Sequence, residues 1–197
     1  MRQPDITKEI ILNKSIKLFN TKGYKSTSIS DITTETGFTK GAIYRHFENK
    51  EALEMKAFDT MMEFIFKIMT KKVKQEINAK DKLFAILDLF ESYISNPFIA
   101  GGCPLLNLSV EFDHTNSLLK NNGKICLEKM KFGLQNIIIK GQKYNQIKES
   151  VDPNSFSTIY FATIEGGIMM SNLNGNNIDI LLVVNHLKSW IQREICT

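Results

Sequence analysis

Apolar residues recur three or four positions apart along almost the whole chain, and runs with strict two-residue alternation are rare. This spacing is typical of amphipathic helices and not of strands. We therefore predict an all-α fold of about nine helices. Their expected bounds are residues 5 or 7–22, 27–34, 40–47, 50–75, 81–95, 104–112, 117–144, 153–173 and 178–195.

Residues that start and stop helices divide the first fifty positions into three short elements. Gly23 and Gly37 are suited to end helices in the left-handed conformation, and Thr27 and Thr39 to cap the helices that follow. Only about four residues separate the second predicted helix from the third, which favours a tight helix-turn-helix corner. We expect residues 1–50 to form one domain and residues 51–197 a larger helical body.

The third predicted helix has an apolar side and a polar side. At about 100° per residue, Ile43 and Phe47 share the inner face, and Phe38 joins them. The outer and flanking positions are Thr39, Lys40, Gly41, Ala42, Tyr44, Arg45 and His46. A basic, hydrogen-bonding face on a buried spine suits the DNA major groove, which is about 12 Å wide and admits a helix.

Each outer residue type has a contact that it can make with DNA. Lys40 can donate to guanine or phosphate, Gly41 lets the backbone approach closely, and Ala42 can meet a thymine methyl. Tyr44 can donate to phosphate, as can Lys50 at the start of the long helix. Arg45 and His46 extend the donor surface, and Thr39 combines a cap with a phosphate contact. Taken singly, each is also compatible with a solvated surface residue.

Positive charge is concentrated at the N-terminal end. Of the formal net charge of +4, residues 1–56 hold 10 Lys/Arg against 7 Asp/Glu, which gives +3, and residues 57–197 hold 15 against 14, which gives +1. An excess of three charges is modest and is compatible with ordinary surface variation. It also favours a head that binds a polyanion.

The segment TSISDITTETGFTKGAIYRHFENKEAL (27–53), with the preceding IILNKSIKLFNTKGYKSTS, resembles the helix-turn-helix of the TetR family of bacterial transcriptional regulators. The resemblance covers residues 7–55 and implies a homodimeric DNA-binding protein, usually a repressor, whose body binds a small inducer. The positions that it implies on DNA are Ser28, Thr39, Lys40, Ala42, Tyr44, His46 and Lys50. Thr33 and Thr36 stand where the family usually has alanine, and Phe38 where it usually has valine, which changes packing near the turn.

The last two predicted helices each carry an apolar stripe, and together with a symmetry mate they would form a four-helix bundle. From the residues alone, packing on the chain's own body is an equal alternative, and the family resemblance favours a homodimer. A dimer also suits DNA, because two recognition helices about 34 Å apart contact both halves of a palindromic operator. The residues expected at this interface are Phe156, Ile159, Tyr160, Thr163, Gly167, Ile180, Val184, Leu187 and Ile191.

Several methionine and aromatic side chains of the body could surround an apolar effector, because such side chains adapt to apolar ligands. The candidates are Phe58, Met61, Met62, Ile65, Phe66, Met69, Phe90, Leu106, Phe112, Met130, Leu134 and Met169, with Glu111, Asp113, His114 and Glu165 as polar partners. The alternative for the apolar residues is plain core, and for the polar ones simple exposure. The identity of the effector does not follow from the sequence.

Other classes of function lack their sequence patterns. The three histidines, His46, His114 and His186, show no metal-ligand spacing, and no phosphate-binding loop, dinucleotide turn or nucleophile elbow is present, so we expect no enzyme, cofactor or metal. Three scattered cysteines, no signal-type N-terminus and no long apolar window favour a cytoplasmic protein with unpaired thiols and no membrane contact. A transcriptional activator, or a DNA-binding protein without a ligand, remains an alternative to a repressor.

Overall fold

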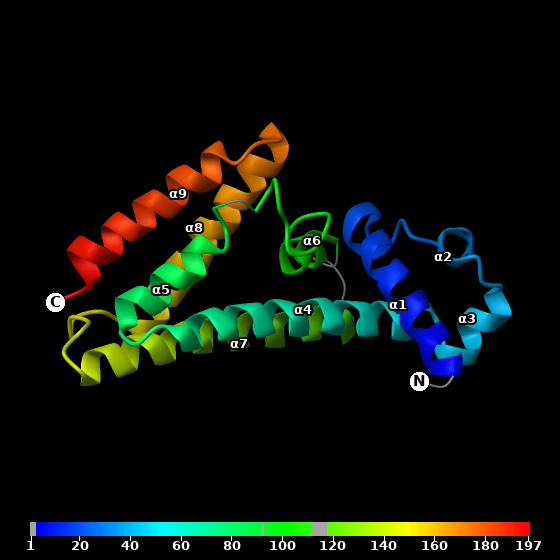
Figure 1. Ribbon diagram of the computed structural model, residues 1–197, viewed down its shortest axis with the longest axis horizontal. Helices are drawn as coiled ribbons and strands as arrows, with labels where there is room; N and C mark the ends of the chain where they lie inside the picture. The colour runs from blue at the N-terminus through cyan, green and yellow to red at the C-terminus, as the bar shows by residue number, and fades with distance from the viewer. Residues whose placement is uncertain (1–2, 92, 112–117) are drawn as a thin grey trace. The chain divides into compact units, whose positions relative to one another are not determined.

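The computed structural model describes residues 3–91, 93–111 and 118–197, and within these ranges the chain is helical (Figure 1). The described part contains nine α-helices and one π-helical turn and no strand, which confirms the all-α prediction. The helices are α1 (Gln3–Lys22), α2 (Ile29–Thr36), α3 (Lys40–His46), α4 (Lys50–Gln75), α5 (Ala79–Asp88), α6 (Pro104–Glu111), α7 (Leu118–Lys143), α8 (Pro153–Asn174) and α9 (Ile178–Trp190), followed by the π-helical turn η1 (Ile191–Ile195). The expected end of the sixth helix at Phe112 and start of the seventh at Ser117 lie outside the described residues.

The N-terminal helix ends agree with the predictions except for one cap. Gly23 follows α1 with φ 95°, and Gly37 follows α2 with φ 73°, both in the left-handed region that glycine favours. Thr39 caps α3 as expected. The cap of α2 is Ser28 and not Thr27, because the Thr27 hydroxyl is buried and donates to the Gly23 carbonyl at 2.6 Å.

The chain forms two compact units. The first consists of residues 1–64 and 99–124, and the second of residues 65–98 and 125–197. Segments distant in sequence therefore combine within each unit, and α4 and α7 contribute residues to both. These units describe packing, and the functional division at residue 50 stays a prediction.

The first unit packs α1, α2, α3 and the start of α4 around one apolar core. Ile11, Phe19, Ile32 and Ile43 are fully buried there. Phe19 stacks on Tyr24 with ring centroids 5.3 Å apart, which fixes the loop after α1 against the core. The stability of these helices comes from this shared burial, because short isolated helices are marginal in water.

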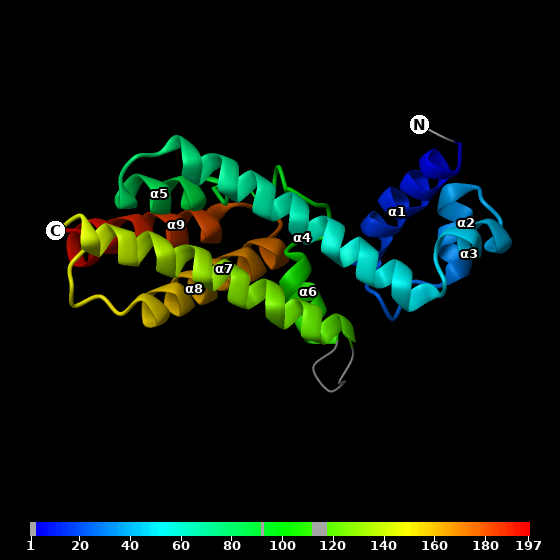
Figure 2. The ribbon, with the colours of Figure 1, turned by 90° about the horizontal axis from the view of Figure 1, so that it is seen from below.

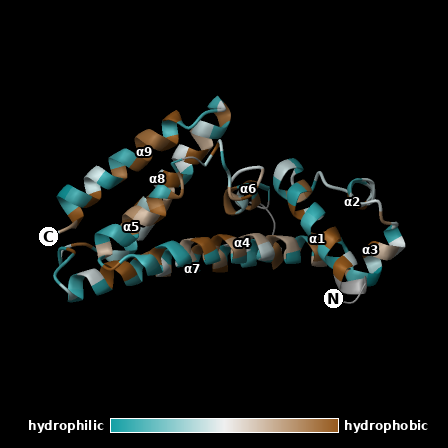
Figure 3. Cartoon of the chain, in the orientation of Figure 1, coloured by the Kyte–Doolittle hydropathy of each residue, from teal (hydrophilic) through white to brown (hydrophobic). Residues whose placement is uncertain are grey.

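The second unit is centred on α8 and α9, which lie side by side and run antiparallel (Figures 1 and 2). Phe156 of α8 stacks on Trp190 of α9 at 5.3 Å. Tyr160 is fully buried and donates its hydroxyl to the Leu83 carbonyl of α5 at 2.8 Å. Hydrophobic and hydrophilic bands alternate along both helices in Figure 3.

The fifth helix is shorter than predicted. The sequence suggested a helix to Ser95, but α5 ends at Asp88 and a series of turns follows. Two contacts with the α8–α9 loop hold these turns: the Ile94 amide donates to Asn177 Oδ1 at 2.9 Å, and Asn177 Nδ2 donates to Ser95 Oγ at 2.8 Å. Tyr93 also packs on Phe98. After Asp88 the amides of Leu89, Phe90 and Tyr93 donate to carbonyls three residues back, and the Ile94 amide uses the long-range bond to Asn177.

The last predicted helix also ends differently, because residues 191–195 widen into the π-helical turn η1. The Cys196 amide donates to the Ile191 carbonyl at 2.9 Å, and Cys196 pairs with Ile147 in an isolated antiparallel bridge. The amide of Lys148 donates to the Ile195 carbonyl at 3.0 Å. Pairing of the chain end with the α7–α8 loop therefore accompanies the wider turn. Every helix in the described ranges is too short or too polar to cross a membrane.

Two glycines of α7 provide a matched test of this packing. A Cβ at Gly133 would meet nothing within 4 Å, whereas one at Gly141 would overlap Ile147 Cγ1 and lie 2.9 Å from Ala79 Cβ. We expect Gly133→Ala to raise the free energy of unfolding by about 1 kcal/mol, because it removes a helix-interior glycine. We expect Gly141→Ala to lower it by about 1–3 kcal/mol through overpacking. Urea unfolding followed by circular dichroism measures both, and equal effects of the two changes would contradict the described packing.

Candidate nucleic-acid interface

The α2–α3 corner is fixed at both helix starts by side-chain caps. Ser28 Oγ accepts from the Asp31 amide at 3.1 Å while Asp31 Oδ2 accepts from the Ser28 amide at 2.7 Å, which forms a capping box. Thr39 Oγ1 accepts from the Ala42 amide at 3.2 Å. Hydrogen bonds from Lys22 and Ser28 hold the pKa of Asp31 well below its usual range. The short α3 is therefore held at a defined angle to α2.

The predicted inner and outer faces of α3 are confirmed. Ile43 is fully buried, Phe47 is 5% exposed, and Phe38 is half-buried. Of the predicted DNA-contacting residues, Ser28, Thr39, Lys40, Gly41, Tyr44 and Arg45 are exposed, and Ala42, His46 and Lys50 are half-buried. The structure thus brings the polar residues of α3 to one outer face of the first unit. Their contact with DNA itself stays a prediction.

Gly41 has no structural task inside the chain. It lies in the first turn of α3, and a Cβ there would meet nothing within 4 Å. A helical glycine costs about 1 kcal/mol relative to alanine, so its presence calls for a reason outside the internal packing. Close approach of another molecule to the helix backbone is such a reason. Beside it, the Lys40 ammonium lies 5.8 Å from the centre of the Tyr44 ring.

Lys50 has an internal role that the sequence did not indicate. Its ammonium donates to the Tyr24 carbonyl at 2.7 Å and pairs with Glu54 at 3.0 Å. The start of α4 is thereby tied to the loop after α1. Burial raises the pKa of Glu54 above its usual range, which outweighs the lowering by Lys50. Phosphate contact by Lys50 stays a prediction, and it would use the remaining N–H donor.

Glu111 at the end of α6 holds the same loop from another side. Its carboxylate accepts from the Tyr24 amide at 2.8 Å, and its backbone carbonyl accepts from the Lys25 ammonium. A Cβ at Gly23 would overlap the Glu111 carboxylate, so this approach requires glycine. Burial, followed by the charge of Glu111, raises the pKa of Tyr24.

The sequence predicts Glu111 among the polar partners of a ligand, and the structure places it against the N-terminal helices instead. The other polar candidates have different outcomes. Glu165 is half-buried on α8, while Asp113 and His114 lie outside the described residues.

A second polar link joins α6 to α1, and sequence reasoning missed it. Asn20 is 3% exposed, and its Nδ2 donates to the carbonyls of Ala100 at 2.8 Å and Gly102 at 3.0 Å. Asn107 Nδ2 lies 3.1 Å from both Asn20 O and Asn20 Oδ1. A Cβ at Gly101 would overlap the Asn20 carbonyl. The only signal in the sequence is an asparagine beside Phe19 on the buried side of α1, which is an unusual place for an amide side chain.

The stripe that we expected at the dimer interface is mostly internal to the chain. Phe156, Tyr160, Gly167, Ile180, Val184, Leu187 and Ile191 are buried. A Cβ at Gly167 would lie 3.0 Å from Ile180 Cδ1, so α8 and α9 of one chain approach closely there. The sequence prediction of these seven residues as contacts between subunits is therefore wrong, because they are sealed between helices of the same chain.

The opposite side of α8 and α9 carries exposed apolar residues. Ile159 and Thr163 belong to this outer face, with Gly166, Met170 and Leu173 continuing it at intervals of three or four. Exposed fractions are 49% for Ile159 and 82% for Leu173. The exposed large apolar residues of α9 are Ile178, Leu181 and Leu182. We call these eight residues the outer α8–α9 face.

Most of the expected effector-contacting residues lie in the core or at its edge. Phe58, Met61, Met62, Ile65, Met69, Phe90 and Leu134 are buried, Phe66, Leu106 and Met130 are half-buried, and Met169 is 49% exposed. None of them lines the cavity of the second unit described below. Phe112 lies outside the described residues. A role of these side chains in ligand binding stays a prediction. The alternative is that they only pack in the core.

Comparison with known proteins identifies the family. Residues 11–54 match the family described as "Bacterial regulatory proteins, tetR family", and residues 79–187 match "Tetracyclin repressor-like, C-terminal domain". The second match alone covers more than half of the chain. The chain belongs to the TetR family. It is a helix-turn-helix transcriptional regulator, as the resemblance implied.

Individual relatives agree with this assignment. A TetR transcriptional regulator from Chloroflexus aurantiacus is 32% identical with a TM-score of 0.95, covering 100% of this chain and 99% of its own. The "Fatty acid metabolism regulator protein" of Bacillus subtilis is 24% identical, covering 89% of this chain and 88% of its own. The "HTH-type transcriptional repressor DhaR" of a Mycobacterium species (strain GP1) is 24% identical over 84% of this chain and 82% of its own. Two of these relatives are named as regulators and the third as a transcriptional repressor.

The α1–α6 link predicts a specific loss of stability. We expect Asn107→Ala to lower the free energy of unfolding by about 1–2 kcal/mol, because it leaves the buried Asn20 and the Gly101 carbonyl without a donor. Asn121→Ala, on the exposed side of α7, is the control and should leave it within about 0.5 kcal/mol. Thermal and urea unfolding measure the change. Equal stability of the two variants would show that the link carries no net stabilisation.

Proposed function

We propose that this TetR-family regulator is a ligand-responsive repressor that binds a palindromic operator as a homodimer. The observation that carries the proposal is the outer face of α3, where Lys40, Tyr44 and Arg45 are exposed around the bare backbone of Gly41. A helix with donors on one side and no side chain at its point of closest approach fits a major groove. The name of the relative DhaR as a repressor supports the sign of regulation.

The proposed contacts differ in what they contribute. Lys40 and Ala42 would meet base edges and so determine sequence choice, while Ser28, Thr39 and Tyr44 would donate to phosphates. Arg45 and His46 extend the donor surface of α3. Lys50 would approach phosphate from the start of α4, where the helix dipole also favours an anion.

Specific recognition by this face requires a second copy. One seven-residue helix contacts few base pairs, and a symmetric dimer presents two such helices to successive major grooves. We propose the outer α8–α9 face as the interface. Its apolar residues recur at helical spacing, and Gly166 is open to close approach because a Cβ there would meet nothing within 4 Å. Pairing two copies would bury side chains that are exposed in one chain.

The link from α6 to the N-terminal helices supports ligand control. Asn107 and Glu111 connect α6 to α1 and to the loop that Lys50 also holds. A shift of α6 would therefore change the position of α1 and of the start of α4. The protein would then have two arrangements, one before and one after the shift of α6. A ligand would release the operator only by binding one of these arrangements better than the other.

If α3 contacts DNA, removing a charge from α3 should lower the affinity for the operator, and removing one from elsewhere on the surface should not. We expect Lys40→Gln to weaken operator binding about tenfold and to alter base preference, because a base contact is worth about 1–3 kcal/mol. Lys67→Gln removes the same charge from an exposed position of α4 and should change affinity less than about twofold. Fluorescence anisotropy with the promoter fragment and with random duplex at fixed salt measures both. Similar affinity for both duplexes would favour a non-specific DNA-binding protein. If no added ligand changes the affinity for the promoter fragment, the protein would be a constitutive DNA-binding protein.

The dimer proposal is tested independently of DNA. We expect Leu182→Glu to shift the protein from dimer to monomer, because pairing the outer α8–α9 face would bury a carboxylate without a partner at a position that is 65% exposed in one chain. Ile77→Glu changes a residue that is 91% exposed outside this face and should leave the dimer intact. Analytical ultracentrifugation measures the mass. A dimer that survives Leu182→Glu would place the interface elsewhere.

A further inference from the structure

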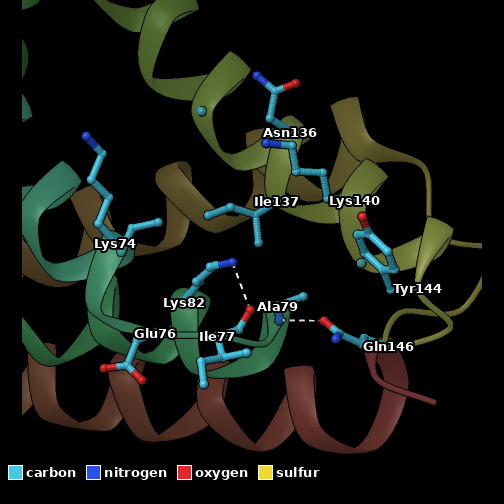
Figure 4. Close-up of a pocket in the computed structure, with 13 residues that line it drawn as sticks. Lys74, Glu76, Ile77, Ala79, Lys82, Asn136, Ile137, Lys140, Tyr144 and Gln146 are labelled. Atoms are coloured by element: carbon cyan, nitrogen blue, oxygen red, sulfur yellow. Dashed lines mark hydrogen bonds between the residues drawn. The ribbon is translucent and has the colours of Figure 1, made fainter.

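The second unit contains a cavity of about 480 Å³ where the end of α4, the start of α5 and the later half of α7 meet (Figure 4). This volume lies within the usual range of small-molecule sites, about 300–1,000 Å³. The α7 residues Gly133, Asn136, Ile137, Lys140 and Gly141 line it, each three or four positions from another of the set, so they share one face, and Tyr144 follows the end of the helix. The other walls come from residues 73–82 and Gln146.

Positive charge predominates in this cavity. Lys74, Lys82 and Lys140 line it with Glu76 as the one carboxylate among its lining residues. The Lys82 ammonium donates to the Ile77 carbonyl at 2.9 Å, which fixes its position and leaves two further N–H donors. In Figure 4 Lys82 extends from α5 toward Ile137 of α7. Three lysines against one carboxylate among the lining residues favour an anionic ligand.

The same cavity offers apolar surface beside the charges. Val73, Ile77 and Ile137 line it, and Ile77 is 91% exposed. The ring of Tyr144, which is 66% exposed, adds a further apolar wall. Gly133 leaves the middle of the α7 wall without a side chain, and a Cβ there would meet nothing within 4 Å. Exposed apolar walls with a few polar groups are the usual composition of a ligand site.

We propose that this cavity binds an amphipathic organic anion, with its acidic group among Lys74, Lys82 and Lys140 and its apolar part against Val73, Ile77 and Ile137. Neither charge nor apolar surface alone accounts for the lining. The lysines would discriminate against neutral and cationic molecules of the same shape, and the apolar walls against small inorganic anions. The further claim that this ligand is also the effector rests on the proposed function. The claim that the cavity binds the ligand is independent of that function.

Isothermal titration of the full chain with four probes tests the ligand class. We use decanoate, decanol, decyltrimethylammonium and inorganic phosphate, so that one probe keeps both features and each of the others lacks one. Decanoate should bind with a stoichiometry of one per chain and at least about tenfold more tightly than the other three. Equal affinity for decanol would overturn the role of the lysines, and equal affinity for phosphate would overturn the role of the apolar walls.

Matched variants locate the site. The double variant Lys82→Gln/Lys140→Gln should raise the Kd for decanoate about tenfold or more, because it removes two charge-assisted contacts. Lys71→Gln on the exposed side of α4 lies outside the cavity lining and should change the Kd less than about twofold. The single variant Lys140→Gln, at an exposed position, gives a folded protein to compare if the double variant unfolds. A Kd unchanged by both Lys140→Gln and the double variant would overturn the site.

Operator binding separates this inference from the proposed function. If decanoate binds in the cavity and lowers operator affinity in wild type but not in Lys140→Gln, both stand. If it binds there without changing operator affinity, the site stands and its role as the effector site fails. If decanoate does not bind while the operator is still held through Lys40, the site fails and DNA recognition stands.

Discussion

The backbone of Tyr24 is the point on which the arrangement of the first unit depends. Its amide is satisfied by the Glu111 carboxylate and its carbonyl by the Lys50 ammonium, while its ring is buried against Phe19. A backbone group left unpaired in such a place costs about 1–3 kcal/mol, so the two contacts are strongly favoured together. Because Glu111 ends α6 and Lys50 begins α4, one residue of a short loop fixes the ends of two helices to the three N-terminal ones.

This constraint explains how a helix as short as α3 is held in a defined position. The helix α3 has seven residues and could not persist alone. Its position comes from Ile43 and Phe47 in the shared core, and from caps at Ser28 and Thr39 that satisfy the first amides of α2 and α3. In the described part of the chain the buried residues Ile43 and Phe47 lie on one side of α3, and Lys40, Gly41, Tyr44 and Arg45 are exposed. Gly41 is retained there although alanine would fit, which points to a requirement outside the chain.

Local features of the structure were predictable from the sequence, and features that depend on distant contacts were not. Helix ends at Gly23 and Gly37, and the cap at Thr39, follow from neighbouring residues alone and are confirmed. The early end of α5 depends on Asn177, more than eighty residues away, and no periodicity near Ser95 indicates it. Glu111 is likewise an ordinary surface glutamate in sequence, and only the fold brings it to Tyr24.

The error on α8 has the same origin, because this helix is apolar on two sides. One stripe contains Phe156 and Tyr160 and the other Ile159 and Met170, and the two are similar in hydrophobicity. Of the two adjacent glycines, Gly167 belongs to the stripe with Phe156 and Tyr160, and Gly166 belongs to the other. A Cβ at Gly167 would crowd Ile180 of the same chain, while one at Gly166 would meet nothing. A helix that needs burial on both sides cannot be satisfied by α9 alone, because α9 covers only the inner stripe. In the described part of the chain Ile159, Met170 and Leu173 of the outer stripe stay exposed, which is the basis for proposing this stripe as the contact with a second copy.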